Sequence, residues 1–456
     1  MPYLLNTPDD QRAMLDAIGV DSLDDLFEMI PASLRLGRTL DIPPAVGEME
    51  LARLVGALAE SNLHGENSTC FLGGGSYDHF VPAVVDTIAG RGEFYTSYTP
   101  YQAEVSQGNL QAMFEYQSLI CQLTGLDVSN ASLYDGGSAA AESVLMAISA
   151  TRRAGRVVVA ESVHPEYRQI LETYFANLET ELVTVPAPSG VVDPSLIQQA
   201  VDDQTACVLI QSPNFFGSLE DVQSISRIAH HAGAISCCVF DPISLALLKR
   251  PGEMDVDIAV AEGQSLGSPM LYGGPYLGIM ACRESFVRRL PGRISGQTVD
   301  RRGERCWVLT LQTREQHIRR EKATSNICTN QGLFALRAAV YLATMGPQGL
   351  LETATLCARK AHYAAEQICR SDRFERVFDG PVFKEFVIRD RQGQVEALLE
   401  HAAGKGILAG ISLGSWYEDL SDCFLVATTE KRTREEIDTL AACLDQAPGE
   451  SSVEHA

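Results

Sequence analysis

A chain of 456 residues is long enough for about two or three domains, and it can bury a core without disulfide or metal staples. Its 59 acidic and 36 basic side chains give a formal charge of −23, which argues against nucleic acid or an anionic membrane surface as the main partner. The chain shows neither a signal-peptide pattern at its start nor a run near the ~20 apolar residues of a membrane span.

The first 60 residues predict a helical arm. Thr7 is a suitable N-cap and Pro8 suits the first helical position of a helix that begins there. A second, short helix is predicted over residues 22–29. A third is predicted over residues 48–61, where apolar residues recur at helical spacing.

Short β-rich runs then alternate with helix-length amphipathic stretches, which predicts βαβ units and a mainly parallel sheet covered on both faces. The predicted strands are residues 157–163, 181–186, 207–211, 235–240, 257–261 and 277–282. The predicted helices between them are residues 165–177, 194–201 and 219–232. We assign this large domain to residues 61–330, and we expect its ligands at the carboxyl ends of the strands.

A long helical region over residues 329–370, interrupted at Gly346-Pro347, links the large domain to a small C-terminal α/β domain. Strands are predicted there at residues 382–388 and 423–427. The linking helix and the small domain together occupy residues 331–456.

Three features at predicted strand ends and helix starts suit a phosphate-bearing aromatic cofactor. Gly136, Gly137 and Ser138 open a helix and can bind an anion, although the same residues also suit an ordinary turn and cap. His164 follows a strand and can stack on a flat ring, or simply cap and pack. Asp241 ends a strand and can hold a protonated pyridine nitrogen, or cap the helix predicted over residues 244–249.

A pyridoxal-phosphate (PLP) enzyme also needs a lysine that forms the Schiff base with the cofactor. That lysine is expected a few tens of residues after the strand that ends at Asp241, but residues 260–269 contain none. Lys249 comes too early and Lys322 too late. The residues therefore describe a PLP fold without its lysine.

The segment 93–108 combines aromatic and polar residues, and Pro100 prevents a regular helix across it. Such a segment suits the lining of a cleft or an interface better than a core, and a half-buried loop at the base of the domain is the less favoured alternative. The candidate lining residues are Tyr95, Tyr98, Tyr101, Gln102, Glu104, Ser106 and Gln107. The glycine-rich run 71–79 suits either a cleft wall or a linker, and it lacks the Gly-Lys-Ser/Thr of a phosphate loop.

The runs 71–79, 93–108, 130–138 and 320–331 resemble the P-protein family of the glycine cleavage system. The resemblance covers nearly the whole chain and is to the alpha subunit of the split bacterial form. It implies the α/β PLP-dependent transferase fold of aspartate-aminotransferase type (fold type I). It also implies the activity of glycine dehydrogenase (aminomethyl-transferring), which decarboxylates glycine, releases CO2 and passes the aminomethyl group to the lipoyl arm of the H-protein.

The same resemblance implies that the PLP lysine belongs to a beta subunit, with two alpha and two beta chains in the complex. The T- and L-proteins of the same system would be further partners. It implies that the tyrosine-rich segment lines the shared cleft. Gly136, Gly137, Ser138, His164 and Asp241 would then form a degenerate cofactor site, and this chain would supply no catalytic residue.

Two other functions stay open at the level of sequence. One is a self-sufficient PLP-dependent decarboxylase or desulfurase that uses Lys249 or Lys322 as an unusual Schiff-base lysine. The other is an inert scaffold for a partner enzyme, against which the tyrosine-rich segment argues. The twelve cysteines form no C-x-x-C pair and sit mostly among apolar residues, so we expect reduced thiols, a cytoplasmic protein and no metal site.

Overall fold

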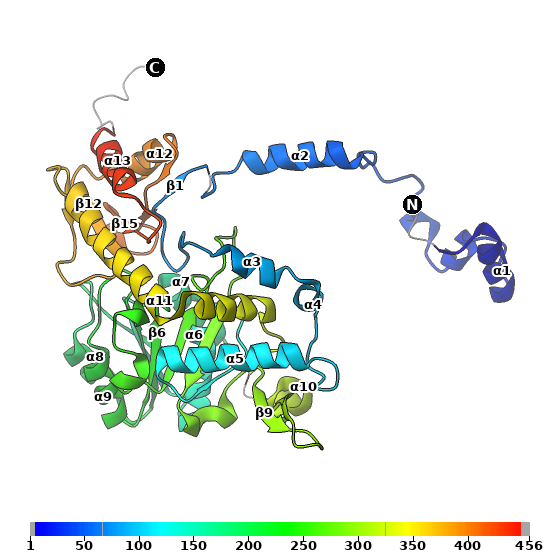
Figure 1. Ribbon diagram of the computed structural model, residues 1–456, viewed down its shortest axis with the longest axis horizontal. Coiled ribbons are helices and arrows are strands. Elements are labelled where there is room, and N and C mark those ends of the chain that lie inside the picture. The colour runs from blue at the N-terminus through cyan, green and yellow to red at the C-terminus, as the bar shows by residue number, and fades with distance from the viewer. Residues whose placement is uncertain (1–4, 66, 324, 448–456) are drawn as a thin grey trace. The chain divides into compact units, whose positions relative to one another are not determined.

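The computed structural model describes residues 5–65, 67–323 and 325–447 (Figure 1). The chain divides into two compact units, Met1–Asn62 and Leu63–Ala456. None of the helices in the described residues is long and apolar enough to cross a membrane. The contact division keeps the predicted large and small domains in one unit, so the boundary at residue 330 remains a prediction.

The first unit consists of short helices without a buried core among its described residues. Helix α1 (Pro8–Ile18) begins at the predicted N-cap, where Thr7 and Asp10 form a capping box. Helix α2 (Glu48–Glu60) confirms the third predicted helix. The second is wrong as an α-helix, because residues Asp24–Phe27 form only a 3-10 turn and Pro31 follows within four residues.

The second unit is built on a mixed, mainly parallel sheet, as predicted. From edge to edge its strands are β2 (Val128–Ser129), β8 (Gly278–Cys282), β7 (Ile258–Glu262), β6 (Ile235–Phe240), β5 (Thr205–Ser212), β3 (Arg156–Ala160) and β4 (Glu181–Val185). Strand β8 runs antiparallel to both of its neighbours, and the strands from β7 to β4 are parallel. All six predicted strands of this region are confirmed.

Helices cover both faces of the sheet, and adjacent residues of β6 show it. Ser236 bonds Ser226 of helix α9 (Val222–His231), whereas Cys237 contacts Ser143 of helix α6 (Gly136–Thr151). Because successive side chains of a strand point to opposite faces, α9 and α6 lie on opposite sides. The other helices around the sheet are α3 (Ala83–Ala89), α4 (Gly92–Tyr95), α5 (Gln107–Thr124), α7 (Pro165–Phe175), α8 (Pro194–Ala200) and α10 (Gln316–Arg319).

The linking helix α11 (Gly332–Ile368) is interrupted where predicted, at Gly346, whose φ of 59° is left-handed. It leads to a second sheet with the order β11 (Phe374–Arg376), β12 (Glu385–Asp390), β15 (Cys423–Ala427) and β14 (Ile411–Ser412). Helices α12 (Val395–Ala403) and α13 (Arg434–Asp445) pack beside it. Two further pairs complete the unit, parallel β1 (Thr69–Cys70) with β13 (Ile407–Leu408) and the hairpin β9 (Ser295–Val299) with β10 (Arg305–Leu309).

Strand β12 begins three residues later than predicted, because residues 382–384 reach toward the large sheet instead. Val382 forms an isolated bridge with Ser218, which follows β5. The next two residues, Phe383 and Lys384, then line a pocket at the carboxyl ends of the large-sheet strands. The small domain therefore contributes side chains to the edge where ligands of such sheets bind.

Candidate functional site

His164 and Asp241 lie in one pocket at the carboxyl ends of the parallel strands. Side chains from the large sheet, the glycine-rich run and the small domain line it, namely Tyr77, His164, Tyr167, Asp241, Glu262, Lys384 and Glu385. The remaining cavity is about 30 Å³, which is room for about one water molecule and not for a cofactor. The pocket is filled by the protein's own side chains.

A carboxylate of this chain stands where the sequence predicts an anion. The Gly136 N–H at the start of α6 donates to Glu262 Oε2 at 3.0 Å, and Glu262 Oε1 accepts from the N–H groups of Gln264 and Leu277 at 2.9 and 3.0 Å. Burial raises the pKa of Glu262 to about 7, and these three N–H groups oppose the shift. Asp135 caps the same helix by accepting from the N–H of Ser138 at 2.7 Å.

A tyrosine ring occupies the face on which His164 is predicted to stack a cofactor. The rings of His164 and Tyr167 are parallel to within 15°, with centroids 4.6 Å apart. His164 Nδ1 accepts from the N–H of Glu166 at 3.2 Å, and its Nε2 donates to the Gly74 carbonyl at 2.7 Å, so the ring is neutral. Burial also lowers the pKa of His164.

Asp241 is paired with a lysine that sequence analysis did not single out. Its Oδ2 lies 2.5 Å from the ammonium of Lys384, whose side chain is only 2% exposed. Its Oδ1 accepts from the N–H groups of Ile243 and Ser244 at 2.9 and 3.1 Å, which is the alternative capping role that the sequence allowed. The predicted helix over residues 244–249 is a 3-10 turn, Ser244–Ala246.

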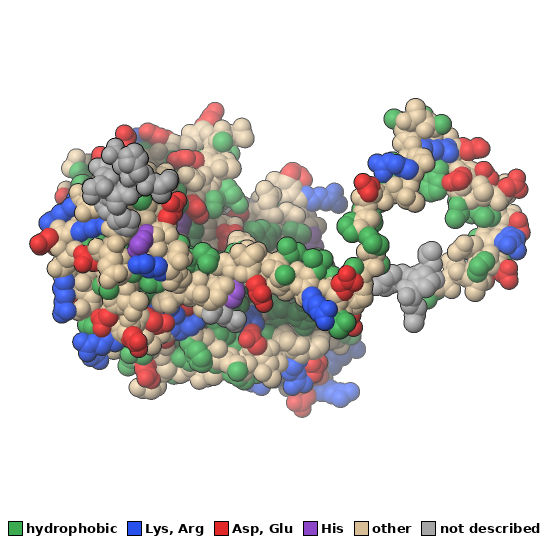
Figure 2. Space-filling model, turned by 90° about the horizontal axis from the view of Figure 1, so that it is seen from above, with side chains coloured by type: hydrophobic (Ala, Val, Ile, Leu, Met, Phe, Trp, Pro, Cys, Tyr) green, Lys and Arg blue, Asp and Glu red, His purple; other side chains and the backbone are tan. Residues whose placement is uncertain are grey.

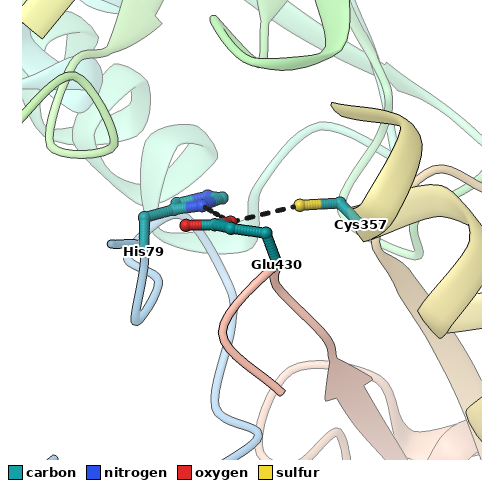
Figure 3. A group of neighbouring side chains, drawn as sticks. All are labelled: His79, Cys357 and Glu430. Carbon is teal, nitrogen blue, oxygen red and sulfur yellow. Dashed lines mark hydrogen bonds and ion pairs between the residues drawn. The ribbon is translucent and has the colours of Figure 1, made fainter. Parts of the chain in front are cut away.

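Lys384 continues into a buried chain of polar groups, of which Figure 3 shows His79 and Glu430. It lies 3.3 Å from the ring centre of Tyr77 and donates to His79 Nε2 at 3.1 Å. His79 Nδ1–H therefore donates to Glu430, at 2.7 Å. Although burial opposes it, the hydrogen bonds from His79 and the Phe80 N–H lower the pKa of Glu430.

His79, Cys357 and Glu430 form the kind of group that binds metal ions, and Figure 3 shows them facing one another. Their hydrogen bonds account for the arrangement without a metal. Burial raises the pKa of the Cys357 thiol, which donates to Glu430 at 3.5 Å, and both nitrogens of His79 are engaged. A metal cation would also have to sit beside the Lys384 ammonium in a buried site, where like charges repel strongly.

The glycine-rich run 71–79 lies between the two domains and joins them. The Gly74 N–H donates to Glu385 Oε1 at 2.7 Å, and the Tyr77 hydroxyl donates to Glu385 Oε2 at 2.9 Å. Asp78 accepts from Lys431 and Arg432 at 2.6 and 3.0 Å. At Gly73, an added Cβ would lie 2.7 Å from the Ala427 side chain, so only glycine fits this close approach.

Glu385 gives the chain a specific dependence of stability on pH. Burial raises the pKa of Glu385 to about 7, above its ordinary value of 4.5, so folding favours its protonated form. This contribution is full below pH 4.5 and is lost as the pH rises to about 7. At about 1.4 kcal/mol for each pKa unit, the loss reaches roughly 3 kcal/mol.

Glu385→Gln keeps an acceptor for the Gly74 N–H and can donate to the Tyr77 hydroxyl, but it cannot ionise. The variant is expected to gain stability relative to the original chain as the pH rises from 5 to 8. Urea unfolding at both pH values measures this difference. Parallel changes in the two proteins would contradict the prediction.

These residues do not fit PLP. Glu262 holds the helix N-terminus meant for the phosphate, Tyr167 covers the ring of His164, and Lys384 neutralises the carboxylate meant for the pyridine nitrogen. Lys384 approaches from the side of Asp241, whereas a Schiff-base lysine must reach the opposite edge of the cofactor ring. Lys249 and Lys322 are exposed and line neither this pocket nor the one formed by the tyrosines.

A second and larger pocket, of about 350 Å³, is lined by the tyrosine-rich segment. Tyr95, Tyr98 and Tyr101 face it together with Asn330 and Gln331 from the start of the linking helix. The Tyr101 hydroxyl donates to Asn330 Oδ1 at 2.7 Å, and the Asn330 amide nitrogen is buried without a partner among the described residues. Tyr98 is 92% exposed although its ring is apolar. This is an open, polar and aromatic surface.

The other four candidate residues of that segment lie outside this pocket. Gln102 and Glu104 are exposed, and Ser106 is the N-cap residue of α5. Gln107 has a structural contact, because its amide donates to the Trp307 carbonyl at 2.8 Å and its oxygen accepts from the Trp307 N–H at 2.9 Å. After α4, which ends at Tyr95, the segment is irregular up to Ser106, as Pro100 requires.

Comparison with known proteins identifies the family. The model of the family described as glycine cleavage system P-protein matches residues 1–444. A relative from Carboxydothermus hydrogenoformans is 51% identical over 446 residues (97% of this chain, 99% of the relative), and one from Thermomicrobium roseum is 50% identical over 451 residues (98% and 100%). Both are named probable glycine dehydrogenase (decarboxylating) subunit 1.

Solved structures extend the comparison to the fold. A crystal structure of glycine decarboxylase (P-protein) of the glycine cleavage system, in inhibitor-bound form, matches with a TM-score of 0.90 at 41% identity, covering 98% of this chain and 100% of the other. A mutant of the lyase C-DES with glycine covalently linked to its PLP cofactor matches with a TM-score of 0.62 at 12% identity, covering 84% and 97%, which shows a shared fold alone. The chain has the α/β fold of the fold type I PLP-dependent enzymes, and it belongs to the glycine cleavage system P-protein family.

Proposed function

We propose that this chain is the alpha subunit of a two-subunit glycine dehydrogenase (aminomethyl-transferring), and that PLP is held by its beta partner. With that partner it decarboxylates glycine, releases CO2 and passes the aminomethyl group to the lipoyl arm of the H-protein. The observation that carries the proposal is the filled pocket, in which Glu262, Tyr167 and Lys384 take the cofactor's place. A member of this family that cannot hold PLP needs a second chain that does.

The contribution of this chain is a wall of the shared cleft. Tyr95, Tyr98 and Tyr101 offer apolar rings with hydrogen-bonding tips, a combination that suits orienting a small substrate and excluding water. Excluding water matters here because a carbanion left by decarboxylation must meet the lipoyl disulfide before it meets a proton. Gly136, Gly137, Ser138, His164 and Asp241 have structural roles in this proposal, as the remains of a cofactor site.

The proposal includes an assembly of two alpha and two beta chains in the cytoplasm, working with the H-, T- and L-proteins. The name "subunit 1" of the relatives supports a partner subunit. All twelve cysteines are free, which suits a reducing compartment.

Exchange of labelled CO2 into the carboxylate of glycine tests the proposal. With PLP and lipoylated H-protein present, exchange is expected only when this chain and its beta partner are combined. Borohydride trapping of PLP, followed by peptide mapping, is expected to label the beta chain alone. Exchange by this chain alone, or trapping on Lys249, Lys322 or Lys384, would contradict the proposal and restore the self-sufficient alternative.

A further inference from the structure

One part of this acidic chain is strongly basic. Residues 283–322, called here the basic lobe, contain eleven Lys and Arg against five Asp and Glu, in a chain whose formal charge is −23. The lobe contains the hairpin β9–β10 and helix α10, which Figure 1 shows at one edge of the second unit. On the face of that unit seen in Figure 2, by contrast, Lys and Arg side chains are interspersed with Asp and Glu.

Five cations of the lobe are free to meet a partner. Arg301 and Arg302 at the hairpin tip, Arg319, Arg320 and Lys322 are all exposed, and among the described residues none of these five has an ion-pair partner. Some exposed arginines elsewhere in the same unit are paired, as Arg391 is with Glu375 at 2.7 Å. Unpaired like charges held together repel one another, so an acidic surface that covers them gains free energy.

The lobe is fixed to the wall of the tyrosine pocket. The Arg293 guanidinium lies 4.0 Å from the ring centre of Tyr101, and it donates to the Cys328 carbonyl at 2.7 Å. The two hydrogen bonds between Gln107 and the backbone of Trp307 join β10 to the start of α5, directly after the tyrosine-rich segment. A protein that docks on the lobe is therefore held beside the cleft.

We propose that the basic lobe is the docking surface for an acidic face of the lipoyl-bearing carrier protein, an inference that rests on the proposed function. A carrier must bind, react and leave in every turnover, and charge gives fast association without a tight complex. A permanent subunit interface would instead be apolar and depleted of charged residues at its centre. Among the described residues of the lobe, the large hydrophobic side chains that are exposed are Val299 and Ile318.

The test uses the complete alpha–beta complex and two acceptors, lipoylated H-protein and free lipoamide. The variant Arg301→Glu/Arg302→Glu/Lys322→Glu is expected to raise the KM for H-protein about tenfold or more and to flatten its dependence on salt. Turnover with free lipoamide should not change, because a small acceptor needs no docking surface. The control Lys249→Glu/Arg359→Glu/Lys405→Glu changes the net charge equally at other exposed sites and should leave both acceptors unaffected.

Each other outcome has one meaning. An unchanged KM for H-protein in the variant, or an equal rise in the control, overturns the docking proposal. If the variant no longer assembles with the beta chain, as measured by sedimentation, the docking proposal is also overturned. The lobe would then be assigned to the contact with the beta subunit. If the unsubstituted complex fails to decarboxylate glycine with either acceptor, the proposed function itself is overturned. This outcome differs from failure of the docking proposal, in which the unsubstituted complex is active.

Discussion

Replacing Lys384 by Met is expected to lower the free energy of unfolding of this chain by about 3–5 kcal/mol. The ammonium is the partner of Asp241 at 2.5 Å, and the carboxylate itself is only 11% exposed. Removing the cation leaves a buried charge without compensation, which costs far more than the loss of an exposed ion pair. Chemical denaturation of the isolated chain at pH 7 measures the change.

The double variant Lys384→Met/Asp241→Asn separates loss of the pair from loss of packing. The introduced asparagine would keep a side-chain oxygen for the N–H groups of Ile243 and Ser244. It would carry no charge, so the double variant should recover most of the lost stability. Lys405→Met, at an exposed lysine that has no ion pair among the described residues, should change little. A Lys384→Met variant as stable as the original chain would show that the pair contributes nothing in solution.

Local patterns in the sequence were enough to predict most of the large sheet. Strand β6 begins and ends at the predicted residues, 235 and 240, because a continuous apolar run is bounded there by Gly233 on one side and Asp241-Pro242 on the other. Pro165 and Gly346 likewise marked a helix start and an interruption. These signals depend on backbone chemistry within a few residues, which is why they can be recognised without the fold.

The filling of the cofactor pocket could not be predicted in the same way, because it depends on contacts between distant segments. Asp241 and Lys384 come from different domains, and Glu262 reaches Gly136 across the sheet. The sequence did carry one signal that we did not use, a Lys384-Glu385 pair inside an apolar run. Two adjacent charges in such a strand cannot both face solvent, since successive side chains point to opposite sides.

Under the proposed function, the filled pocket also explains how a family member keeps the cofactor fold without holding the cofactor. Each group that would have bound PLP now has an internal partner of similar charge or shape: a carboxylate for a phosphate, a phenol ring for a pyridine, an ammonium for a protonated nitrogen. The charged groups of the pocket thereby have internal partners, whereas the buried Ser265 hydroxyl has none among the described residues. Under the same proposal, the surface near Tyr98 serves the active site shared with the partner.

Tyr98→Ala is expected to reduce turnover of the reconstituted alpha–beta complex by about 10- to 100-fold, the range of a lost substrate-positioning contact. Tyr98 is 92% exposed in this chain and lines the tyrosine pocket, so its side chain contributes little to the packing of the folded alpha subunit alone. Its free energy of unfolding should therefore change by less than about 0.5 kcal/mol. Steady-state kinetics of glycine decarboxylation and urea unfolding measure the two quantities.

Tyr272→Ala is the matched control, because Tyr272 is 76% exposed and lies outside the tyrosine pocket. A subunit that shapes the active site must distinguish the two tyrosines, whereas an inert scaffold must not. Loss of turnover at Tyr98 with normal assembly and an active Tyr272→Ala complex would therefore place this chain in the reaction itself. If turnover is unchanged in both variants, the alpha subunit acts only as a scaffold for its partner. The exposed tyrosine surface would then have a function other than shaping the active site.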